Sequence, residues 1–346
     1  MTKSKNKIIV FVCIILFFLG LGFVLRYFLS TQKTSANINN NIITNQDINE
    51  SISVAYSTDQ YYIYPTIVSM TSLMENLNKN TVCKFTVLVS GEIPQEEIEK
   101  LKTLEKNYKN CSVNIIDMGE QYNNSEIRCW SKAMYYRLCL PEILKQDPKC
   151  IYVDGDTIIR QDLNEMFNIN LDNYYIAGIR DINSLINKNS SHHKTIGIPD
   201  LNTYVCSGVL IMNLEKMRQD NICEKFDEIV KQNDEKPFLH FPDMDILNKV
   251  CYGHILCLPF KYGALAHAII EYTQPADKNE YVQWASNPKD WSEGSTNPVI
   301  LHYTGQKPWT HIKSDLYLEW WNYADKTDFK TEIHNSYNGL KNYYNQ

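Results

Sequence analysis

The stretch Ile151-Tyr152-Val153-Asp154-Gly155-Asp156-Thr157-Ile158-Ile159 joins two apolar runs through a pair of carboxylates that are one residue apart. A short apolar run that ends at a turn signal is typical of a buried strand. Such a strand delivers Asp154 and Asp156 to the edge of a sheet, where hard divalent cations find oxygen ligands. The stretch therefore predicts a metal site and, as a first hypothesis, a metal-dependent enzyme that acts on a phosphate-bearing substrate.

The context of this pair matters, because an isolated Asp-x-Asp triplet is explained better by a solvated turn than by a metal site. Strand signals on both sides place Asp154 and Asp156 beside a core. Unpaired carboxylates in such surroundings are costly unless a cation neutralises them. We therefore interpret both residues as metal ligands.

Strand-like and helix-like segments alternate along the rest of the chain. The strand-like segments lie at 52–56, 85–89, 113–116, 175–179, 204–214 and 299–303, and the helix-like ones lie at 65–78, 94–108, 131–145 and from 243 onward. This alternation predicts a parallel sheet with helices on both faces. Ligands of open α/β sheets bind beyond the carboxyl ends of the strands, which is where Asp154 and Asp156 fall.

The chain has 346 residues, of which 44% are apolar and 21% are charged, so it has ample material for one large domain or two ordinary ones. The formal net charge is -6, and Lys and Arg are dispersed along the sequence. A dispersed, net negative charge offers no basic stripe for nucleic acid, so this partner class is excluded.

The N-terminus predicts a membrane anchor. Residues 1–7 form a basic flank, and the uncharged run 8–25 would be about 27 Å long as a helix, so residues 8–29 are expected to cross the membrane once. The alternative is a cleaved signal peptide, although 34–36 is a poor cleavage site. The charge bias favours a cytoplasmic N-terminus, and the polar residues 30–50 are expected to form a flexible stem.

Four motifs in the folded part carry a resemblance to a known family. They are the stretch quoted above, Ser207-Gly208-Val209-Leu210-Ile211-Met212-Asn213-Leu214, Asp243-Met244-Asp245-Ile246-Leu247-Asn248 and His302-Tyr303-Thr304-Gly305-Gln306-Lys307-Pro308-Trp309. Their order and spacing over residues 52–309 resemble glycosyltransferase family 8. The resemblance implies a GT-A fold over residues 51–312, with a Rossmann-like, mixed and mostly parallel sheet.

The resemblance also implies a metal site and a diphosphate site. Asp154 and Asp156 match the family's metal ligands, with Gly155 between them, and His302 matches the third ligand of Mn²⁺ or Mg²⁺. Read alone, His302 beside an apolar strand would more often be a core histidine. Gly305 permits close approach of the backbone to a diphosphate, and Lys307 supplies a positive charge.

The first strand leads into a segment that resembles the family's nucleotide-binding loop. The resemblance implies that Asp59 accepts a hydrogen bond from the uracil imide and that Tyr61 lies against the base, with Ala55 and Tyr56 assigned to the same site. From the sequence alone, Asp59 is equally well explained as the N-cap of the next helix.

At the sugar end, the resemblance assigns Arg137 and Asp243 to catalysis, and Ser207, Gly208, Asp243 and Met244 to contact with the donor sugar. Asp243 after Pro242 is also a good helix start. This chain departs from the family at Met244, where Gln is usual, and at Cys206, where Asn is common. A thioether cannot donate a hydrogen bond, so the sugar end is where the protein is expected to be unusual.

The expected function is a membrane-anchored, retaining transferase that moves a hexose from UDP-glucose or UDP-galactose to a glycan, lipid-linked or protein acceptor. One alternative is a metal-independent hydrolase with paired carboxylates. Another is a catalytically impaired family member that binds a nucleotide-sugar or glycan. Residues 313–346 are expected to form a helical tail whose aromatic side chains pack on the body, and His192 and His193 are expected in an exposed loop.

Overall fold

The computed structural model describes residues 51–182, 191–271 and 288–344. The chain divides into two units, Met1–Ile48 and Asn49–Gln346, and the described residues all belong to the second. The predicted basic flank, anchor and stem (1–50) lie outside the described residues. Within the described ranges, every helix is too short or too polar to cross a membrane.

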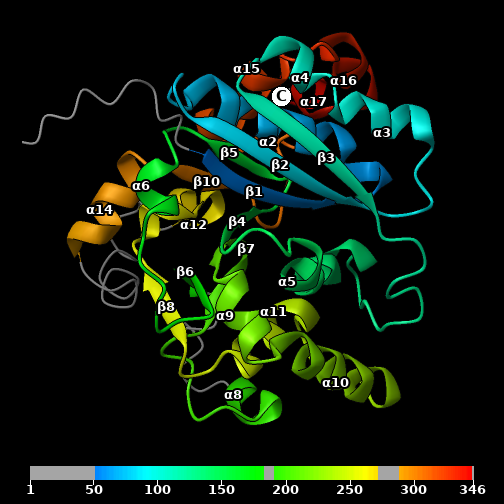
Figure 1. The fold of residues 1–346 in the computed structure, drawn as a ribbon. Helices are drawn as coiled ribbons and strands as arrows, with labels where there is room; N and C mark the ends of the chain where they lie inside the picture. Colours follow the sequence, from blue (N-terminus) through cyan, green and yellow to red (C-terminus); the bar gives the residue numbers. More distant parts are fainter. Residues whose placement is uncertain (1–50, 183–190, 272–287, 345–346) are drawn as a thin grey trace, which may run out of the picture. The chain divides into compact units, whose positions relative to one another are not determined.

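A seven-stranded sheet with the order β3-β2-β1-β4-β7-β6-β8 forms the centre of this unit (Figure 1). Its strands are β1 (Ser51–Thr58), β2 (Val82–Val89), β3 (Cys111–Asp117), β4 (Cys150–Val153), β6 (Ile176–Arg180), β7 (Val205–Met212) and β8 (Ile255–Leu258). Strand β7 runs antiparallel to both neighbours, and the other pairs are parallel. The expected mixed, mostly parallel sheet is confirmed.

Helices cover both faces of this sheet because alternate strand residues enter two separate cores. In β4, Ile151 and Val153 belong to one core, and Cys150 and Tyr152 belong to the other. The first core includes residues of α2 (Ile63–Asn76), α3 (Gln95–Leu101) and α15 (Asp315–Ala324). The second includes residues of α5 (Leu140–Ile143), α9 (Leu214–Gln219), α10 (Ile222–Glu235) and α11 (Pro242–Val250).

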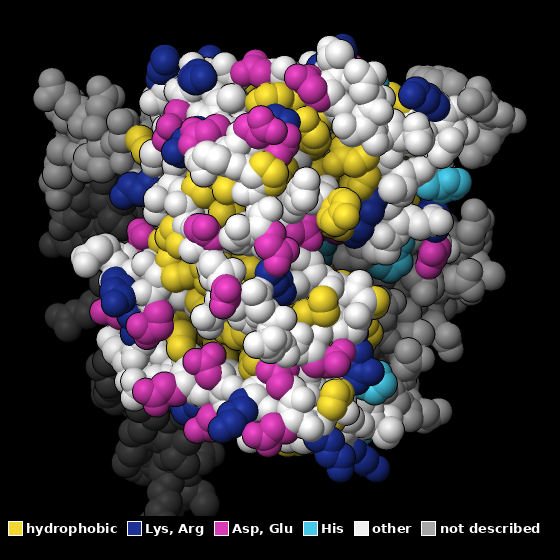
Figure 2. All heavy atoms as spheres, turned by 90° about the vertical axis from the view of Figure 1, so that its right-hand side faces the viewer, with side chains coloured by type: hydrophobic (Ala, Val, Ile, Leu, Met, Phe, Trp, Pro, Cys, Tyr) yellow, Lys and Arg dark blue, Asp and Glu magenta, His cyan; other side chains and the backbone are white. Residues whose placement is uncertain are grey.

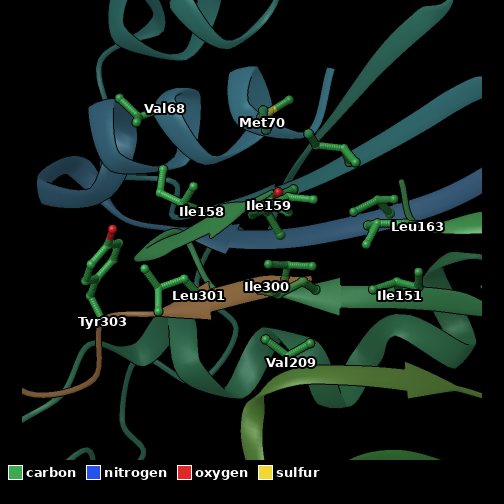
Figure 3. Packing of buried hydrophobic residues seen from close by; sticks show 14 of the residues in the cluster. Val68, Met70, Ile151, Ile158, Ile159, Leu163, Val209, Ile300, Leu301 and Tyr303 are labelled. Atoms are coloured by element: carbon green, nitrogen blue, oxygen red, sulfur yellow. The ribbon is translucent and has the colours of Figure 1, made fainter. Parts of the chain in front are cut away.

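A small three-stranded sheet has the order β5-β10-β9, with β5 (Thr157–Ile159), β10 (Ile300–His302) and β9 (Ala264–Leu265). Strand β10 is antiparallel to β5. Figure 3 shows that Ile158 and Ile300 of this sheet pack in the same core as Val68 of α2. The chain therefore leaves the large sheet at the end of β4 and enters the small one at β5 through the Asp154-Gly155-Asp156 connector.

The helix expected over 94–108 is interrupted. The structure has α3 and then α4 (Leu104–Asn107). Between them, the Thr103 hydroxyl donates a hydrogen bond to the Lys100 carbonyl at 2.7 Å. A threonine that bonds back to its own preceding turn competes with the helical ladder, which accounts for the break.

The helix expected over 131–145 is also not a regular α-helix. It is a 3-10 helix, η2 (Lys132–Cys139), followed by the short α5. Pro141 has no N–H with which to continue the hydrogen-bond ladder from the preceding turn. The tighter turn places Arg137, near the middle of η2, among buried residues.

The remaining elements complete the edges of the unit. They are η1 (Gln60–Tyr62), α6 (Asn164–Phe167), α8 (His192–Ile196), η3 (Phe260–Tyr262), α12 (Ala266–Glu271), α14 (Pro288–Thr296), α16 (Lys330–Ser336) and α17 (Gly339–Tyr344). In the C-terminal segment, Tyr317, Trp320 and Trp321 are buried. The expectation that these aromatic side chains pack on the body is confirmed.

Candidate active site

The structure brings Asp154, Asp156 and His302 together at the carboxyl end of β4. One ligand atom from each lies within 4.8 Å of those of the other two. The carboxylates come from the β4–β5 connector, and His302 ends β10. Because β10 pairs antiparallel with β5, His302 lies opposite Thr157 and therefore beside Asp156.

The surroundings of this group fit a divalent cation. Asp156 Oδ1 and His302 Nδ1 are buried and have no hydrogen-bond partner, although His302 Nε2 approaches Asp156 Oδ1 to 3.2 Å. A buried carboxylate oxygen without a partner is costly. Gly208 leaves room beside the group, since a Cβ there would fall 2.2 Å from His302 Cε1 and 2.6 Å from Asp154 Oδ2. Two carboxylates and an imidazole suit Mn²⁺ better than Mg²⁺.

Charges at this group perturb the protonation of both buried partners. Burial tends to raise the pKa of Asp156, but the positive charges of Lys307 and His302 outweigh it and lower the pKa below its usual range. Burial tends to lower the pKa of His302, but the charge of Asp156 outweighs it and raises the pKa to about 10. The Lys307 ammonium pairs with Asp156 and also donates to the Tyr303 carbonyl at 2.9 Å.

Arg137 bridges Asp154 of the candidate metal site and Asp243 of α11. Its guanidinium donates to Asp154 Oδ1 at 2.9 Å and to the Ser207 carbonyl at 2.5 Å, and its Nε lies 3.4 Å from Asp243 Oδ2. Arg137 also lies over the ring of Tyr152, whose hydroxyl donates to Asp154 Oδ1 at 2.8 Å. The buried Arg137 guanidinium thus holds both carboxylates in place. Burial raises the pKa of Asp243, although the positive charge of Arg137 opposes this shift.

We expect Arg137→Met to lower the free energy of unfolding by about 3–5 kcal/mol, because it leaves the buried carboxylate of Asp243 and the partly buried carboxylate of Asp154 without their cation. Urea denaturation measures this loss. The matched control is Arg160→Met, which removes the partner of Glu319 at 2.9 Å from a pair that is only partly buried. That change should cost about 1 kcal/mol or less. Equal losses in the two variants would contradict the role given to Arg137.

The loop after β1 forms the other end of the site. Asp59 caps η1 by accepting the backbone N–H groups of Tyr61 and Tyr62 at 2.9 and 3.1 Å, so the N-cap interpretation of Asp59 is confirmed. The Tyr61 side chain is 82% exposed. The predicted residues Ala55 and Tyr56 lie elsewhere, because both are fully buried within β1 and Tyr56 bonds to Ser69.

A cavity of about 1340 Å³ connects these features. Of the residues predicted for the site, the following line it: Asp59, Tyr61, Arg137, Asp154, Gly155, Asp156, Ser207, Gly208, Asp243, Met244, His302, Gly305 and Lys307. Cys206 also lines it, whereas Ala55 and Tyr56 do not. Gly305 has a φ of +77°, a conformation that favours glycine. Figure 2 shows the face of the molecule that lies to the right in Figure 1, where apolar side chains are interspersed with charged ones.

The expectation that His192 and His193 lie in an exposed loop is wrong, because both residues belong to α8 and are partly buried; the contacts of His192 are the clearer case. His192 begins α8, and its Nε2 lies 2.7 Å from Asp245 Oδ1. Asp245 is fully buried and also accepts the Tyr204 hydroxyl at 2.5 Å. A buried carboxylate attracts hydrogen-bond donors from distant segments, and this long-range partner was not visible in the sequence.

The bond to Asp245 raises the pKa of His192 above its usual value, although partial burial opposes the shift. A raised pKa means that the protonated ring stabilises the fold fully below about pH 6.5 and that this contribution is lost as the pH rises through the folded-state value. We expect His192→Gln to cost about 1–2 kcal/mol at pH 5.5 and less at pH 8.5, measured by urea denaturation. His193→Gln is the control, and a pH-independent difference for His192→Gln would contradict the assignment.

The sequence analysis missed two aromatic residues of the cavity wall. Trp130 and Phe241 line the cavity and contact each other, with ring centroids 5.7 Å apart. Each directly precedes a helix start, Ser131 or Pro242. The sequence did contain one signal for each residue, namely an aromatic side chain next to a helix start. The contact between Trp130 and Phe241 could not be predicted, because the two residues are far apart in the sequence.

Comparison with known proteins agrees with this geometry. A model of glycosyl transferase family 8 matches residues 53–313. General stress protein A of Bacillus subtilis is 24% identical over 268 residues, which are 75% of this chain and 88% of that protein. Lipopolysaccharide 1,2-glucosyltransferase of Escherichia coli is 26% identical over 293 residues, which are 84% of this chain and 79% of that protein.

A solved structure shares the fold. Galactosyltransferase LgtC in complex with donor and acceptor sugar analogs superposes with a TM-score of 0.66 at 20% identity, over 80% of this chain and 96% of that one. The family model spans most of the described chain and includes the Asp154, Asp156 and His302 group. The chain therefore belongs to glycosyl transferase family 8 and is a glycosyltransferase.

Proposed function

We propose that the protein transfers a hexose from UDP-glucose or UDP-galactose to a glycan, lipid-linked or protein acceptor, with retention of the anomeric configuration. The observation that carries the proposal is the convergence of Asp154, Asp156, His302 and Lys307 on one cavity. This set combines oxygen and imidazole ligands with a fixed positive charge, which suits a diphosphate held through a divalent cation.

The cavity separates the recognition of the nucleotide from that of the sugar. Tyr61 offers an exposed ring to the uracil base, and Asp59 offers carboxylate lone pairs beyond those used by the backbone of η1. Gly305 lets the backbone approach the diphosphate, and Lys307 lies beside it with its ammonium. When bound by Asp154, Asp156 and His302, Mn²⁺ or Mg²⁺ neutralises charge that develops on the leaving diphosphate.

The residues at the sugar end would orient the donor. Asp243 is buried, and its Oδ2 is ion-paired with Arg137 Nε at 3.4 Å but makes no hydrogen bond, so it can accept one from a sugar hydroxyl. Arg137 holds Asp243 and Asp154 in a fixed relation. The acceptor hydroxyl would attack from the face that the nucleotide leaves, with its proton passing to a phosphate oxygen. Asp243 then stabilises the positive charge at the reacting carbon.

The activities named for similar proteins support the substrate class. They include a lipopolysaccharide 1,2-glucosyltransferase and a galactosyltransferase solved with donor and acceptor sugar analogs. A glucosyl or galactosyl donor for this chain is the proposal drawn from them.

A donor screen tests the proposal. The full-length chain, purified in detergent, is incubated with a panel of nucleotide-sugars, and release of the nucleotide is measured with Mn²⁺, with Mg²⁺ and with a chelator. We expect release from UDP-hexoses that requires the metal. Undiminished release in the chelator, or a preference for another nucleotide, would overturn the proposal.

Met244 supports a second candidate, a family member that binds the donor with little turnover. Its thioether lines the cavity where a hydrogen-bond donor would be useful. Metal-dependent binding of UDP without release of UDP from any donor in the panel would favour this candidate. Increased turnover in Met244→Gln would show that the thioether is what limits catalysis.

We also propose that residues 8–29 anchor the catalytic unit to a membrane, with the N-terminus in the cytoplasm. The uncharged run 8–25 and the lysines before it support the proposal. A single span with a cytoplasmic N-terminus places the catalytic unit on the opposite side of the membrane. Protease added from that side of intact membranes should therefore degrade the catalytic unit, and protease added from the cytoplasmic side should not. Release of the protein by high salt alone would contradict an anchor.

A further inference from the structure

Two half-exposed aromatic side chains lie in contact on the cavity wall. Trp130 is 42% exposed and Phe241 is 38% exposed, and their ring centroids are 5.7 Å apart at an interplanar angle of 57°. Among the described residues, the large hydrophobic side chains that are exposed are these two and Tyr61, and all three line the same cavity. Exposed apolar surface at a cavity mouth is typical of a binding site.

Buried hydrogen bonds hold the segment that carries Phe241. The Asp245 Oδ2 atom accepts the backbone N–H groups of His240 and Phe241 at 2.9 and 3.0 Å. Asp245 is itself fully buried and is held by Tyr204 and His192 through its other oxygen. The position of the Phe241 ring is therefore fixed by the fold.

The segment that carries Trp130 is tied to the same region. The Arg128 Nε donates to the Leu239 carbonyl at 3.0 Å, and the Glu126 N–H donates to Asp234 at 2.8 Å. The backbone N–H of Trp130 donates a hydrogen bond to the backbone carbonyl of Ile127 at 2.9 Å. Two segments far apart in the sequence thus hold the two rings together, although leaving the rings half exposed forgoes hydrophobic stabilisation.

The sequence places Phe241 close to the sugar end of the cavity. In the large sheet, β4 lies between β1 and β7. The Tyr61 loop follows β1, and the Asp154-Gly155-Asp156 connector follows β4. Phe241 is two residues before Asp243, and therefore within about 7 Å of it along the chain. Phe241 and the Trp130 ring that contacts it therefore lie near the acid assigned to the donor sugar, in the cavity that Tyr61 also lines.

The surroundings suit one face of a sugar ring. A pyranose presents C–H groups on its face and hydroxyl groups around its rim. The wall of the same cavity carries polar side chains that can bond to such hydroxyls, among them Glu92, Asn123 and Asn124. An aromatic face with a polar rim fits a carbohydrate better than it fits an extended lipid chain, which offers no hydroxyls.

We propose that Trp130 and Phe241 form an aromatic platform that binds the pyranose ring of the acceptor, which makes the acceptor a glycan. The inference rests on the proposed function, because the acceptor site is defined relative to the donor site. The platform determines the affinity for the acceptor and makes no contact with the nucleotide.

The test compares Trp130→Leu and Phe241→Leu with the unmodified full-length chain. Leucine keeps apolar volume and removes the ring. Transfer from the UDP-hexose found in the donor screen is measured to methyl glucosides, methyl galactosides, lactose and maltose, and release of UDP to water is measured without them. We expect each variant to raise KM for the sugar acceptor about tenfold while release of UDP to water changes less than about twofold.

Tyr61→Leu serves as the matched comparison and should show the opposite pattern, with a raised KM for the donor. A platform variant that weakens UDP binding as Tyr61→Leu does would overturn the inference and make the platform a base site. Unchanged KM for every acceptor would also overturn it. Both outcomes differ from failure of the proposed function. In that case the unmodified chain itself would show no metal-dependent release of UDP.

If the unmodified chain releases no UDP, a direct measurement of sugar binding still tests the aromatic platform. Trp130 is the exposed tryptophan among the described residues, since Trp291, Trp309, Trp320 and Trp321 are buried. Its fluorescence should change as lactose, maltose or the methyl hexosides are added, and the change should disappear in Trp130→Leu. Absence of any change across these sugars would refute the platform.

Discussion

The Asp156→Asn variant is expected to lose about a thousandfold in kcat/KM with the donor identified in the screen, or roughly 4 kcal/mol of transition-state stabilisation. The loss follows from the proposed metal ligation, because Asp156 is a buried member of the candidate metal site and is paired with Lys307. An amide keeps the shape but removes the charge that holds a cation. Steady-state kinetics at several Mn²⁺ concentrations, together with calorimetric titration of Mn²⁺, measure the effect.

The matched control is Asp172→Asn, which removes an exposed carboxylate that bonds to Asn170 and is absent from the cavity wall. It should leave both kcat/KM and Mn²⁺ affinity unchanged. Circular dichroism melting shows that both variants remain folded. A fully active Asp156→Asn variant, or one that binds Mn²⁺ as tightly as the unmodified chain, would rule out the metal-dependent mechanism.

A single methyl group at Gly208 should have the second largest effect. The added Cβ of Gly208→Ala would lie 2.2 Å from His302 Cε1 and 2.6 Å from Asp154 Oδ2. Neither neighbour can withdraw easily, because His302 belongs to β10 and Asp154 is held by Arg137 and Tyr152. We expect Mn²⁺ affinity to fall by about ten- to a hundredfold, with a loss of activity at least as large.

Gly263→Ala separates this clash from a general effect of glycine replacement. Its Cβ would meet Ile179 at 3.4 Å or more, an ordinary van der Waals distance. That variant should bind Mn²⁺ normally in the calorimeter. If Gly208→Ala also binds Mn²⁺ normally, the structure has the wrong arrangement of Asp154 and His302.

The sequence was sufficient to predict the sheet and the metal-binding group. Alternating periodicity predicts the sheet, because strand and helix patterns differ along the chain. The family motifs brought His302 to Asp154 and Asp156, and the pairing of β10 with β5 explains this juxtaposition. The alternative of a metal-independent hydrolase is set aside by the family match.

Other features depend on contacts that spacing does not encode. Arg137 was assigned to the site by the family resemblance alone, and its burial follows from the 3-10 turn of η2 and its bond to Ser207. His192 forms a hydrogen bond with Asp245, which is more than fifty positions away in the sequence. The contact between Trp130 and Phe241 likewise joins separate segments. Such side-chain partners are set by tertiary packing, which overrides local propensity.

The pairing of β10 with β5 has a consequence for biosynthesis. The third metal ligand, His302, is synthesised long after Asp154 and Asp156, and closing so long an intervening loop costs conformational entropy. A nascent or truncated chain that ends before β10 can form most strands of the large sheet but cannot complete the metal-binding group. If this group binds Mn²⁺ as proposed, we expect Mn²⁺ affinity to appear only once β10 has paired with β5, so that it reports the completion of folding.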